Sequence, residues 1–444
     1  MAELKLDSSK IVGVIKPMHA VNNGPIRARN DQSRGNFDAY KAARIPFARN
    51  HDASHCATYG GPHCVDVANI FRDFNADPED PANYDFLLTD ILIQNTLDAG
   101  TETYYRLGAS IEHWAKKYNT LPPPDFKKWA VICEHIIAHY NEGWADGYHH
   151  NIRYWEIWNE PDLDPDDSTN KRCWGGTAAE YYELYKITAT HLKNRFPNVK
   201  IGGPALAYNV GEWMDNFLAA LTKDGEKTPM DFFSWHTYCI HPDKILERAK
   251  IVRDKLDAAG YTETESILNE WNYVKGWGKE WFQYSVNTIH NLKGGAFTMS
   301  CMLASQNSSI DLLMYYDARP TPGFCGLFNI YDFSPMKPYY AFPMFADLYD
   351  LKNQVSCETD DPDVYAIAAR GEDGTLKTVV CYYQEDDEVK DAKTVVLTDA
   401  AGDLTGMTCK IVDETRNLED YEVKVSGNTV EIVLTPNSYV LLSK

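Results

Sequence analysis

Two glutamates, each embedded in an apolar and aromatic run, are the residues best placed to do chemistry. Glu160 lies in the segment YWEIWNEPD, and Glu270 lies in the segment LNEWN. A pair of carboxyl groups can cleave a glycosidic bond when one protonates the leaving oxygen and the other attacks the anomeric carbon. In enzymes that retain the anomeric configuration, these groups lie roughly 5 to 5.5 Å apart. Such chemistry requires a fold that carries both glutamates to one sugar ring.

Eight short apolar runs, rich in Val, Ile, Phe and Tyr, could supply that fold. They alternate with longer helical patterns up to about residue 345, which is typical of a parallel sheet built from β-α-β units. The expected strands are residues 11–18, 44–50, 101–108, 152–159, 199–206, 231–238, 266–272 and 311–317. Eight parallel strands close into a barrel, so we predict a (β/α)8 TIM barrel over residues 11–345.

The connecting segments and the tail complete the prediction. Apolar residues at helical spacing predict helices over residues 83–100, 125–142, 178–195, 211–223, 241–259 and 278–292. After residue 345, short alternating runs separated by Gly, Asp and Asn turns predict an antiparallel β-sandwich domain over residues 346–444. Residues 1–10 are candidates to add a strand to it. A chain of 444 residues is long enough for a barrel with such an appendage.

Polar residues gather where the expected barrel strands end, which is the face on which TIM barrels build their active sites. The expected set is His19, Asn22, Arg49, His51, Asp52, Glu112, Asn159, Glu160, His236, Tyr238, Glu270, Tyr316 and Asp317. Trp174 joins them as a candidate surface for sugar stacking, because it lies in a polar loop and not on a strand. A buried ion-pair network remains the alternative for Arg49, His51 and Asp52.

Three motifs resemble those of clan A glycoside hydrolases: WEIWNEPD, HTY and LNEWN, in this order. The string YWEIWNEPDL, followed by WGGT and EYYELY, most resembles family 39, which includes β-xylosidases, α-L-iduronidases and arabinose-releasing enzymes. The resemblance implies that Glu160 is the acid/base, that Glu270 is the nucleophile, and that Asn159 hydrogen-bonds the 2-hydroxyl of the sugar. It also implies that Tyr238 holds and polarises Glu270, while His236 lines the same subsite.

The substrate stays open between xylosides and arabinosides. We predict a retaining, β-xylosidase-like enzyme, with an α-L-arabinofuranosidase or arabinobiosidase as the alternative. A uronic acid substrate is less favoured, because the strand ends offer mainly Arg49 and Arg319 as cations. A catalytically silent glycan-binding barrel is the rival from another class of protein. The presence of both glutamates with their supporting Asn and Tyr argues against it.

Composition limits the partners and the compartment. The net charge of −21, from 64 acidic and 43 basic residues, disfavours binding to nucleic acid or to anionic membranes. No apolar run of 18 residues occurs, and the start MAELKLDSSK lacks the layout of a signal peptide. Ten cysteines without a CxxC pair indicate reduced thiols. We predict a cytoplasmic protein, with a secreted form whose signal was removed as the alternative, and a carbohydrate as its partner.

Two clusters could bind a metal ion, and neither has a standard pattern. His51, His55, Cys56, His63 and Cys64 match no zinc-finger spacing. The acidic residues 162–167 are more typical of a solvated loop than of a calcium site. We therefore predict no metal and no cofactor, and the oligomeric state is left unassigned.

Overall fold

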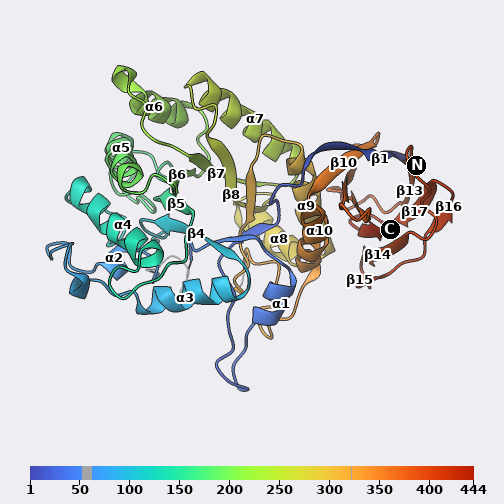
Figure 1. Cartoon of the computed structure of the whole chain (residues 1–444), viewed down its shortest axis with the longest axis horizontal. Helices are drawn as coiled ribbons and strands as arrows, with labels where there is room; N and C mark the ends of the chain where they lie inside the picture. Colours follow the sequence, from blue (N-terminus) through green and yellow to red (C-terminus); the bar gives the residue numbers. More distant parts are fainter. Residues whose placement is uncertain (53–62, 322) are drawn as a thin grey trace.

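The computed structural model describes residues 1–52, 63–321 and 323–444. A closed barrel of eight parallel strands lies beside a ten-stranded sheet (Figure 1). The barrel strands are β2 (Ala20–Asn22), β3 (Phe47–Arg49), β4 (Glu102–Leu107), β5 (Tyr154–Ile157), β6 (Lys200–Leu206), β7 (Phe232–Cys239), β8 (Glu265–Tyr273) and β9 (Leu312–Tyr315). Pairing of β2 with β9 closes the ring. The predicted TIM barrel is confirmed.

Helices surround the barrel, and their starts follow from local sequence. Thr177 and Glu180 form a capping box at the start of α5, and Asp125 caps α4 through the N–H groups of residues 127 and 128. The longer helices are α3 (Leu87–Asp98), α4 (Phe126–Asn141), α5 (Ala178–Arg195), α6 (Glu212–Leu221), α7 (Pro242–Ala258), α8 (Lys279–Ile289), α9 (Leu292–Gln306) and α10 (Ala341–Leu351). Short helical turns are α1 (Phe37–Ala42), α2 (Val67–Ile70), η1 (Pro81–Asn83), η2 (Lys223–Gly225) and η3 (Lys337–Tyr340).

The expected helix over residues 278–292 is in fact α8, and a second helix, α9, follows it. Asn291 caps α9 by accepting hydrogen bonds from the N–H groups of residues 293 and 294. Nearly every side chain of α9 is buried, so the helix has no polar face and shows no amphipathic period. It carries two adjacent glycines, which further weaken a helix prediction.

The expectation for the first barrel strand was wrong. Residues 2–14 form β1, which belongs to the ten-stranded sheet and lies between β10 and β13. Its first half alternates strictly, with Ala2, Leu4 and Leu6 buried, which is the pattern of a strand with one face on a core. The true first barrel strand, β2, spans only three buried residues and leaves little pattern to recognise.

The ten-stranded sheet encloses its own hydrophobic core. Its order is β15-β14-β18-β12-β11-β10-β1-β13-β17-β16, and its neighbours are antiparallel except for β1 and β13. The strands after the barrel are β10 (Asn353–Thr359), β11 (Val364–Arg370), β12 (Leu376–Tyr382), β13 (Lys393–Asp399), β14 (Thr408–Val412), β15 (Asn417–Asp420), β16 (Lys424–Ser426), β17 (Thr429–Leu434) and β18 (Tyr439–Ser443). The helices α9 and α10 pack between the barrel and this sheet (Figure 1). The predicted antiparallel β-domain is confirmed as one curled sheet.

Inside the barrel, an apolar layer lies below a charged one. The apolar layer includes Phe47, Tyr154 and Ile267. Two residues further along the same strands come Arg49, Glu156 and Asn269, all fully buried. Side chains two apart on a strand share a face, so the polar layer stacks directly on the apolar one toward the C-terminal mouth.

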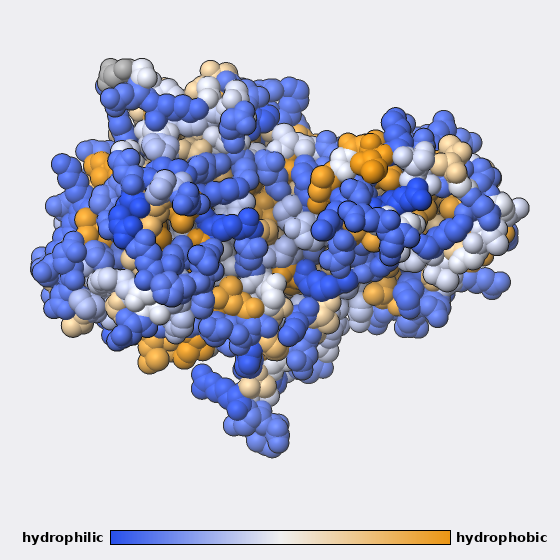
Figure 2. Space-filling view, viewed as in Figure 1, coloured by the Kyte–Doolittle hydropathy of each residue, from blue (hydrophilic) through white to orange (hydrophobic). Residues whose placement is uncertain are grey.

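The face of the molecule in Figure 2 is mostly hydrophilic, with small separate hydrophobic groups. Within the described parts of the chain, none of the helices has the length and apolar character needed to span a bilayer.

Candidate active site

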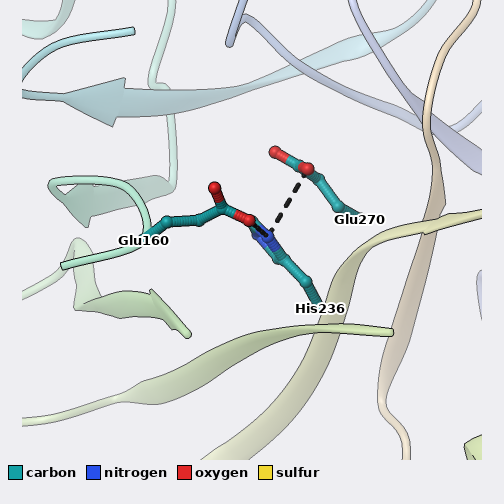
Figure 3. Close-up of side chains that lie close together, drawn as sticks. All are labelled: Glu160, His236 and Glu270. Carbon is teal, nitrogen blue, oxygen red and sulfur yellow. Dashed lines mark hydrogen bonds and ion pairs between the residues drawn. The ribbon is translucent and has the colours of Figure 1, made fainter. Parts of the chain in front are cut away.

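The two glutamates meet over a histidine at the C-terminal mouth of the barrel (Figure 3). Glu160 follows β5, Glu270 lies within β8, and His236 lies within β7. Nδ1 of His236 is 2.8 Å from Oε1 of Glu160 and 3.4 Å from Oε2 of Glu270. One oxygen of each carboxylate and a ring nitrogen of His236 all lie within 4.8 Å of one another. Carboxyl groups this close suit direct attack on a sugar carbon, because no space separates them for an intervening water.

An unusual backbone turn presents Glu160. Trp158 has φ of 76° and Glu160 has φ of 47°, in the left-handed region that costs L-residues about 1–2 kcal/mol each. Two hydrogen bonds hold the turn: the N–H of Trp158 donates to Leu107 O at 2.8 Å, and that of Glu160 donates to Ala205 O at 3.0 Å. Strain held in this way by neighbouring strands is typical of functional residues.

Burial disfavours the ionised form of the Glu160 carboxyl group. Its side chain is 13% exposed, and burial raises its pKa to about 7. Besides the ring of His236, it contacts the Cys173 thiol, whose Sγ lies 3.6 Å from Oε2. Burial lowers the pKa of His236 to about 4, so the ring is neutral near pH 7. Glu160 therefore has the properties of a proton donor at neutral pH.

Glu270 is held by donors that favour its charged form. Arg49 Nη1 donates to Oε1 at 2.7 Å, and the Tyr238 hydroxyl donates to Oε2 at 2.9 Å. Burial raises the pKa of Glu270, while His236 and Arg49 oppose that rise. Because a permanent cation contacts Glu270 directly, it ionises more readily than Glu160. The two carboxyl groups are thus differentiated as an acid and a nucleophile.

Arg49 is the centre of the buried polar layer below the glutamates. Besides Glu270, its guanidinium donates to Glu156 Oε2 at 2.7 Å, to Asn159 Oδ1 at 2.6 Å and to Asn22 Oδ1 at 3.1 Å. Both Arg49 and Glu156 are completely buried. Although burial alone would lower it, Glu156 and Glu270 raise the pKa of Arg49, so its positive charge is permanent. A cation at this position disfavours a metal ion at the neighbouring carboxylates.

Replacing Arg49 by methionine is expected to lower the free energy of unfolding by about 3–5 kcal/mol, because it leaves Glu156 charged and buried without its cation. Urea denaturation followed by tryptophan fluorescence measures the change. The double variant Arg49→Met/Glu156→Gln should recover part of the loss, since it removes the orphaned charge. A loss below about 1 kcal/mol, the scale of an exposed ion pair, would contradict this role for Arg49.

A second polar network borders the nucleophile. The Tyr316 hydroxyl donates to Asp52 Oδ2 at 2.5 Å, His63 Nε2 lies 3.3 Å from Asp52 Oδ1, and Arg319 lies 3.7 Å from Asp52 and 3.6 Å from Asp317. Although burial alone would raise it, His51 and Arg319 hold the pKa of Asp52 well below its usual range. Burial raises the pKa of Asp317 to about 7. Both carboxyl groups are buried, whereas His51 and Tyr316, which contact Asp52 or lie beside it, line the cavity and can hydrogen-bond sugar hydroxyls.

A cavity of about 770 Å³ opens above these residues, which is within the usual range for ligand sites and larger than one pentose requires. Six of the expected residues line it: His51, Asn159, Glu160, Tyr238, Glu270 and Tyr316. His236, Arg49, Asp52 and Asp317 lie behind that lining. Further residues line the walls, and they are Ile111, His113, Leu163, Arg172, Ala207, Tyr208, Arg248, Trp277, Phe282 and Phe324.

Most of the additional wall residues lie on loops beyond the strand ends, while Arg248 lies on α7 and Phe282 on α8, and no motif marks any of them. Trp277 carried a usable signal, because KGWGK is a tryptophan in a polar loop after the seventh barrel strand. The same reasoning selected Trp174, which the structure instead places in the core. Trp174 is buried, donates from Nε1 to Thr177 O at 2.8 Å and packs edge-on against Trp158.

Glu112 also lies away from the cavity lining. Its carboxylate accepts hydrogen bonds from the N–H groups of Tyr118 and Asn119 and from the Thr120 hydroxyl, so it organises its own loop. Trp174 and Glu112 therefore leave the set of substrate contacts. In the suggested metal cluster, His55 and Cys56 lie outside the described residues, while His63 contacts Asp52. The acidic segment contributes Asp162, which accepts three backbone N–H bonds from residues 207–209.

Comparison with known proteins agrees with this geometry. The family model "Glycosyl hydrolases family 39" matches residues 48–270. A β-xylosidase of Geobacillus stearothermophilus is 24% identical over 358 residues, covering 71% of this chain and 65% of the relative. A β-xylosidase of Caldicellulosiruptor saccharolyticus is 29% identical over 170 residues, covering 35% and 31%. The chain thus aligns with less than two thirds of either relative. The crystal structure of a glucosidase from Croceicoccus marinus shares the fold, with a TM-score of 0.80 at 21% identity over 100% of this chain and 98% of that chain.

Proposed function

The chain belongs to the glycosyl hydrolases of family 39, and on that premise we propose that it hydrolyses glycosidic bonds with retention of the anomeric configuration. The observation that carries the proposal is the approach of the Glu160 and Glu270 carboxylate oxygens to within 4.8 Å, across one neutral histidine. We assign catalysis to the barrel formed by β2 to β9, and not to the ten-stranded sheet.

The proposed reaction has two displacements. The Glu270 carboxylate bonds to the anomeric carbon as the bond to the leaving oxygen breaks, and the proton of Glu160 passes to that oxygen. Glu160, now a carboxylate, then takes a proton from water while the water oxygen attacks the anomeric carbon. The bond to Glu270 breaks, and both glutamates return to their starting states. No redox step or cofactor enters this scheme.

The other side chains have proposed positioning and binding roles. Tyr238 and Arg49 hold Glu270 in its attacking orientation through the bonds described above. The Arg49 guanidinium also fixes the side-chain oxygen of Asn159, which turns the Asn159 amide nitrogen away from Arg49 and makes it a donor for the sugar 2-hydroxyl. The Asp52 network offers acceptors and donors to the remaining hydroxyls, through His51 and Tyr316 at the cavity wall.

We propose a β-xyloside as the substrate, with xylose as the released unit. The two relatives described above are β-xylosidases, which supports this choice over an α-L-arabinoside. The test is a panel of p-nitrophenyl glycosides comprising β-xyloside, α-L-arabinofuranoside, α-L-arabinopyranoside, β-glucoside and β-galactoside. The highest kcat/KM is expected on the β-xyloside. Preference for the arabinofuranoside would identify an α-L-arabinofuranoside as the substrate in place of the β-xyloside, and the proposed mechanism would be unchanged.

Retention is tested separately from the choice of sugar. Proton NMR of the first product formed should show the same anomer as the substrate. A 2-deoxy-2-fluoro glycoside with an activated leaving group should add one glycosyl mass to the protein, on the peptide that contains Glu270. An inverted first product, or a label on another residue, would overturn the proposed mechanism.

The alkaline limb of kcat/KM is expected near pH 7, since only protonated Glu160 can donate and burial raises its pKa to about 7. The Cys173 thiol favours the ionised form of Glu160, so Cys173→Ala should move the limb to higher pH. A pH series on an alkyl β-xyloside, whose leaving group needs a proton, measures the alkaline limb of the parent enzyme and that of Cys173→Ala. The p-nitrophenyl glycoside is the control, because its leaving group departs without help and the limb should weaken. An unmoved limb in Cys173→Ala would refute the thiol contribution.

Eight cysteines of the described residues are free thiols: Cys133, Cys173, Cys239, Cys301, Cys325, Cys357, Cys381 and Cys409. This supports our proposal of a reducing compartment such as the cytoplasm.

A further inference from the structure

The acid/base marks the side of the cavity on which the leaving group lies. Glu160 must reach the departing oxygen, so the wall around it contacts the leaving sugar, while the wall around Glu270 contacts the ring that is attacked. We assign to the leaving-group wall five lining residues whose segments are hydrogen-bonded to the Glu160 loop or to His236, namely Leu163, Arg172, Ala207, Tyr208 and Arg248. Two of these five residues are arginines, in a chain whose net charge is −21.

The other cations at the barrel mouth are already neutralised. Arg49 is bonded to Glu156 and Glu270, and Arg319 lies between Asp52 and Asp317. On the leaving-group wall itself, Arg172 is bonded through two nitrogens to Asp164. These arginines are therefore poor candidates to balance an extra negative charge on the substrate.

Arg248 differs from all of them. It is half-buried on α7, lines the cavity and donates from Nη1 to the carbonyl oxygen of His236 at 2.9 Å. Among the residues that the structure describes, no carboxylate forms an ion pair with it. Burial lowers its pKa, opposed by the more distant Asp162, Cys239 and Glu247, so its charge is only partly compensated.

Tyr208 completes a surface that suits a sugar ring. It is 50% exposed and lies on the same wall as Arg248, on the loop that follows β6. The N–H groups of residues 207–209 donate to Asp162, so the backbone of this loop is fixed. An aromatic ring and an incompletely compensated guanidinium that line one cavity can hold the ring and the carboxylate of the same sugar.

We propose that the leaving-group side of this cavity binds a sugar that bears a carboxylate, a uronic acid, with Arg248 as the residue that recognises the charge. The inference rests on the proposed glycosidase function and names its leaving group. It differs from a uronic acid at the attacked ring, because the cations beside Glu270 are engaged by the protein's own carboxylates. The xylose unit stays the glycone, and the acidic unit is the sugar released by protonation.

A matched pair of disaccharides tests the proposal: xylose β-linked to O4 of glucuronate, and xylose β-linked to O4 of glucose. The two differ only in the carboxylate at C6. The parent enzyme should hydrolyse the glucuronate compound with the higher kcat/KM. In Arg248→Met, the ratio of kcat/KM between the acidic and neutral disaccharides should fall roughly tenfold or more, as expected when a charge-assisted hydrogen bond is lost.

Two further variants separate recognition from general charge effects. Lys250→Met removes a positive charge from the same helix at an exposed ion pair with Asp254, and it should leave the ratio as in the parent. Arg248→Lys keeps the charge but loses the planar fork, so its ratio should fall between those of parent and Arg248→Met. Added salt should lower the ratio of the parent enzyme, because it screens the charge of Arg248. The same salt should have little effect on the ratio of Arg248→Met.

Several results would overturn the proposal. One is a parent enzyme that shows no preference for the acidic disaccharide. A second is a parent enzyme that hydrolyses the p-nitrophenyl β-xyloside but neither disaccharide. Another is an Arg248→Met variant that loses both disaccharide activities equally. Failure of the proposed function looks different, because the parent would then cleave no glycoside of the panel. If Arg248→Met fails to fold, the ratio measured for Arg248→Lys decides the matter.

Discussion

Replacement of Glu270 by alanine is expected to lower kcat by on the order of 10⁴- to 10⁶-fold, the scale on which removal of a covalent nucleophile acts. The Glu270 side chain is buried, and its bonds to Arg49 and Tyr238 orient its carboxylate for attack. Alanine offers no group that can attack the anomeric carbon from this position. Folding should survive, because alanine leaves room for water and Arg49 keeps its bond to Glu156.

Chemical rescue makes this result specific. Azide is small enough to enter the space that the Glu270 side chain leaves, and it attacks the anomeric carbon from the face that Glu270 used. The product from a β-glycoside should therefore be the α-glycosyl azide, identified by NMR. Glu212→Ala, which removes an exposed carboxylate at the start of α6, is the matched control and should retain parental kcat. Substantial turnover by Glu270→Ala without azide would contradict the assignment of the nucleophile.

Replacement of Glu160 by alanine is the second large effect, and its size should depend on the leaving group. For an alkyl β-xyloside, loss of general acid assistance should lower kcat/KM by about 10²- to 10⁴-fold. For the p-nitrophenyl glycoside, the first displacement needs no proton, so kcat/KM should change far less. The second displacement still lacks its base, and the covalent intermediate should accumulate with a burst of p-nitrophenolate.

Stopped-flow detection of that burst, with azide added in parallel, checks the prediction. In Glu160→Ala, azide attacks the intermediate formed on Glu270, and the product should be the β-glycosyl azide. The opposite configurations expected from the two variants distinguish the two glutamates. An equal loss on both kinds of leaving group would refute the role of Glu160 as the proton donor.

The parts of the fold that follow a simple period could be predicted from the sequence. Five barrel strands lie within their expected segments, and β7 and β8 extend one residue past theirs, β7 at one end and β8 at both, because each is a run of apolar residues between helices. The first did not, because β2 has only three residues and the stronger pattern nearby belongs to β1. Helix α9 was missed for a related reason, since burial on all sides removes the polar face that a periodicity analysis requires.

The candidate site likewise contains some residues that could be predicted from the sequence and others that could not. Glu160 directly after β5, His236 within β7 and Glu270 within β8 all belong to recognisable motifs, and the structure brings them together. Arg248 lies on α7, and its place on the cavity wall depends on how that helix packs against β7, which no local pattern encodes. Trp174 failed as a substrate contact because a polar neighbourhood in sequence did not imply an exposed position in space.

The placement of β1 has a consequence for how the chain matures on the ribosome. Its residues are translated before the barrel, whereas their sheet partners in β10 and β13 are translated after it. Until then, the buried face of Ala2, Leu4 and Leu6 has no core to join, and both strand edges are open to foreign pairing. The sheet can therefore close only after the barrel strands have been made, and a nascent chain arrested before about residue 399 cannot complete β13 and leaves β1 without that partner.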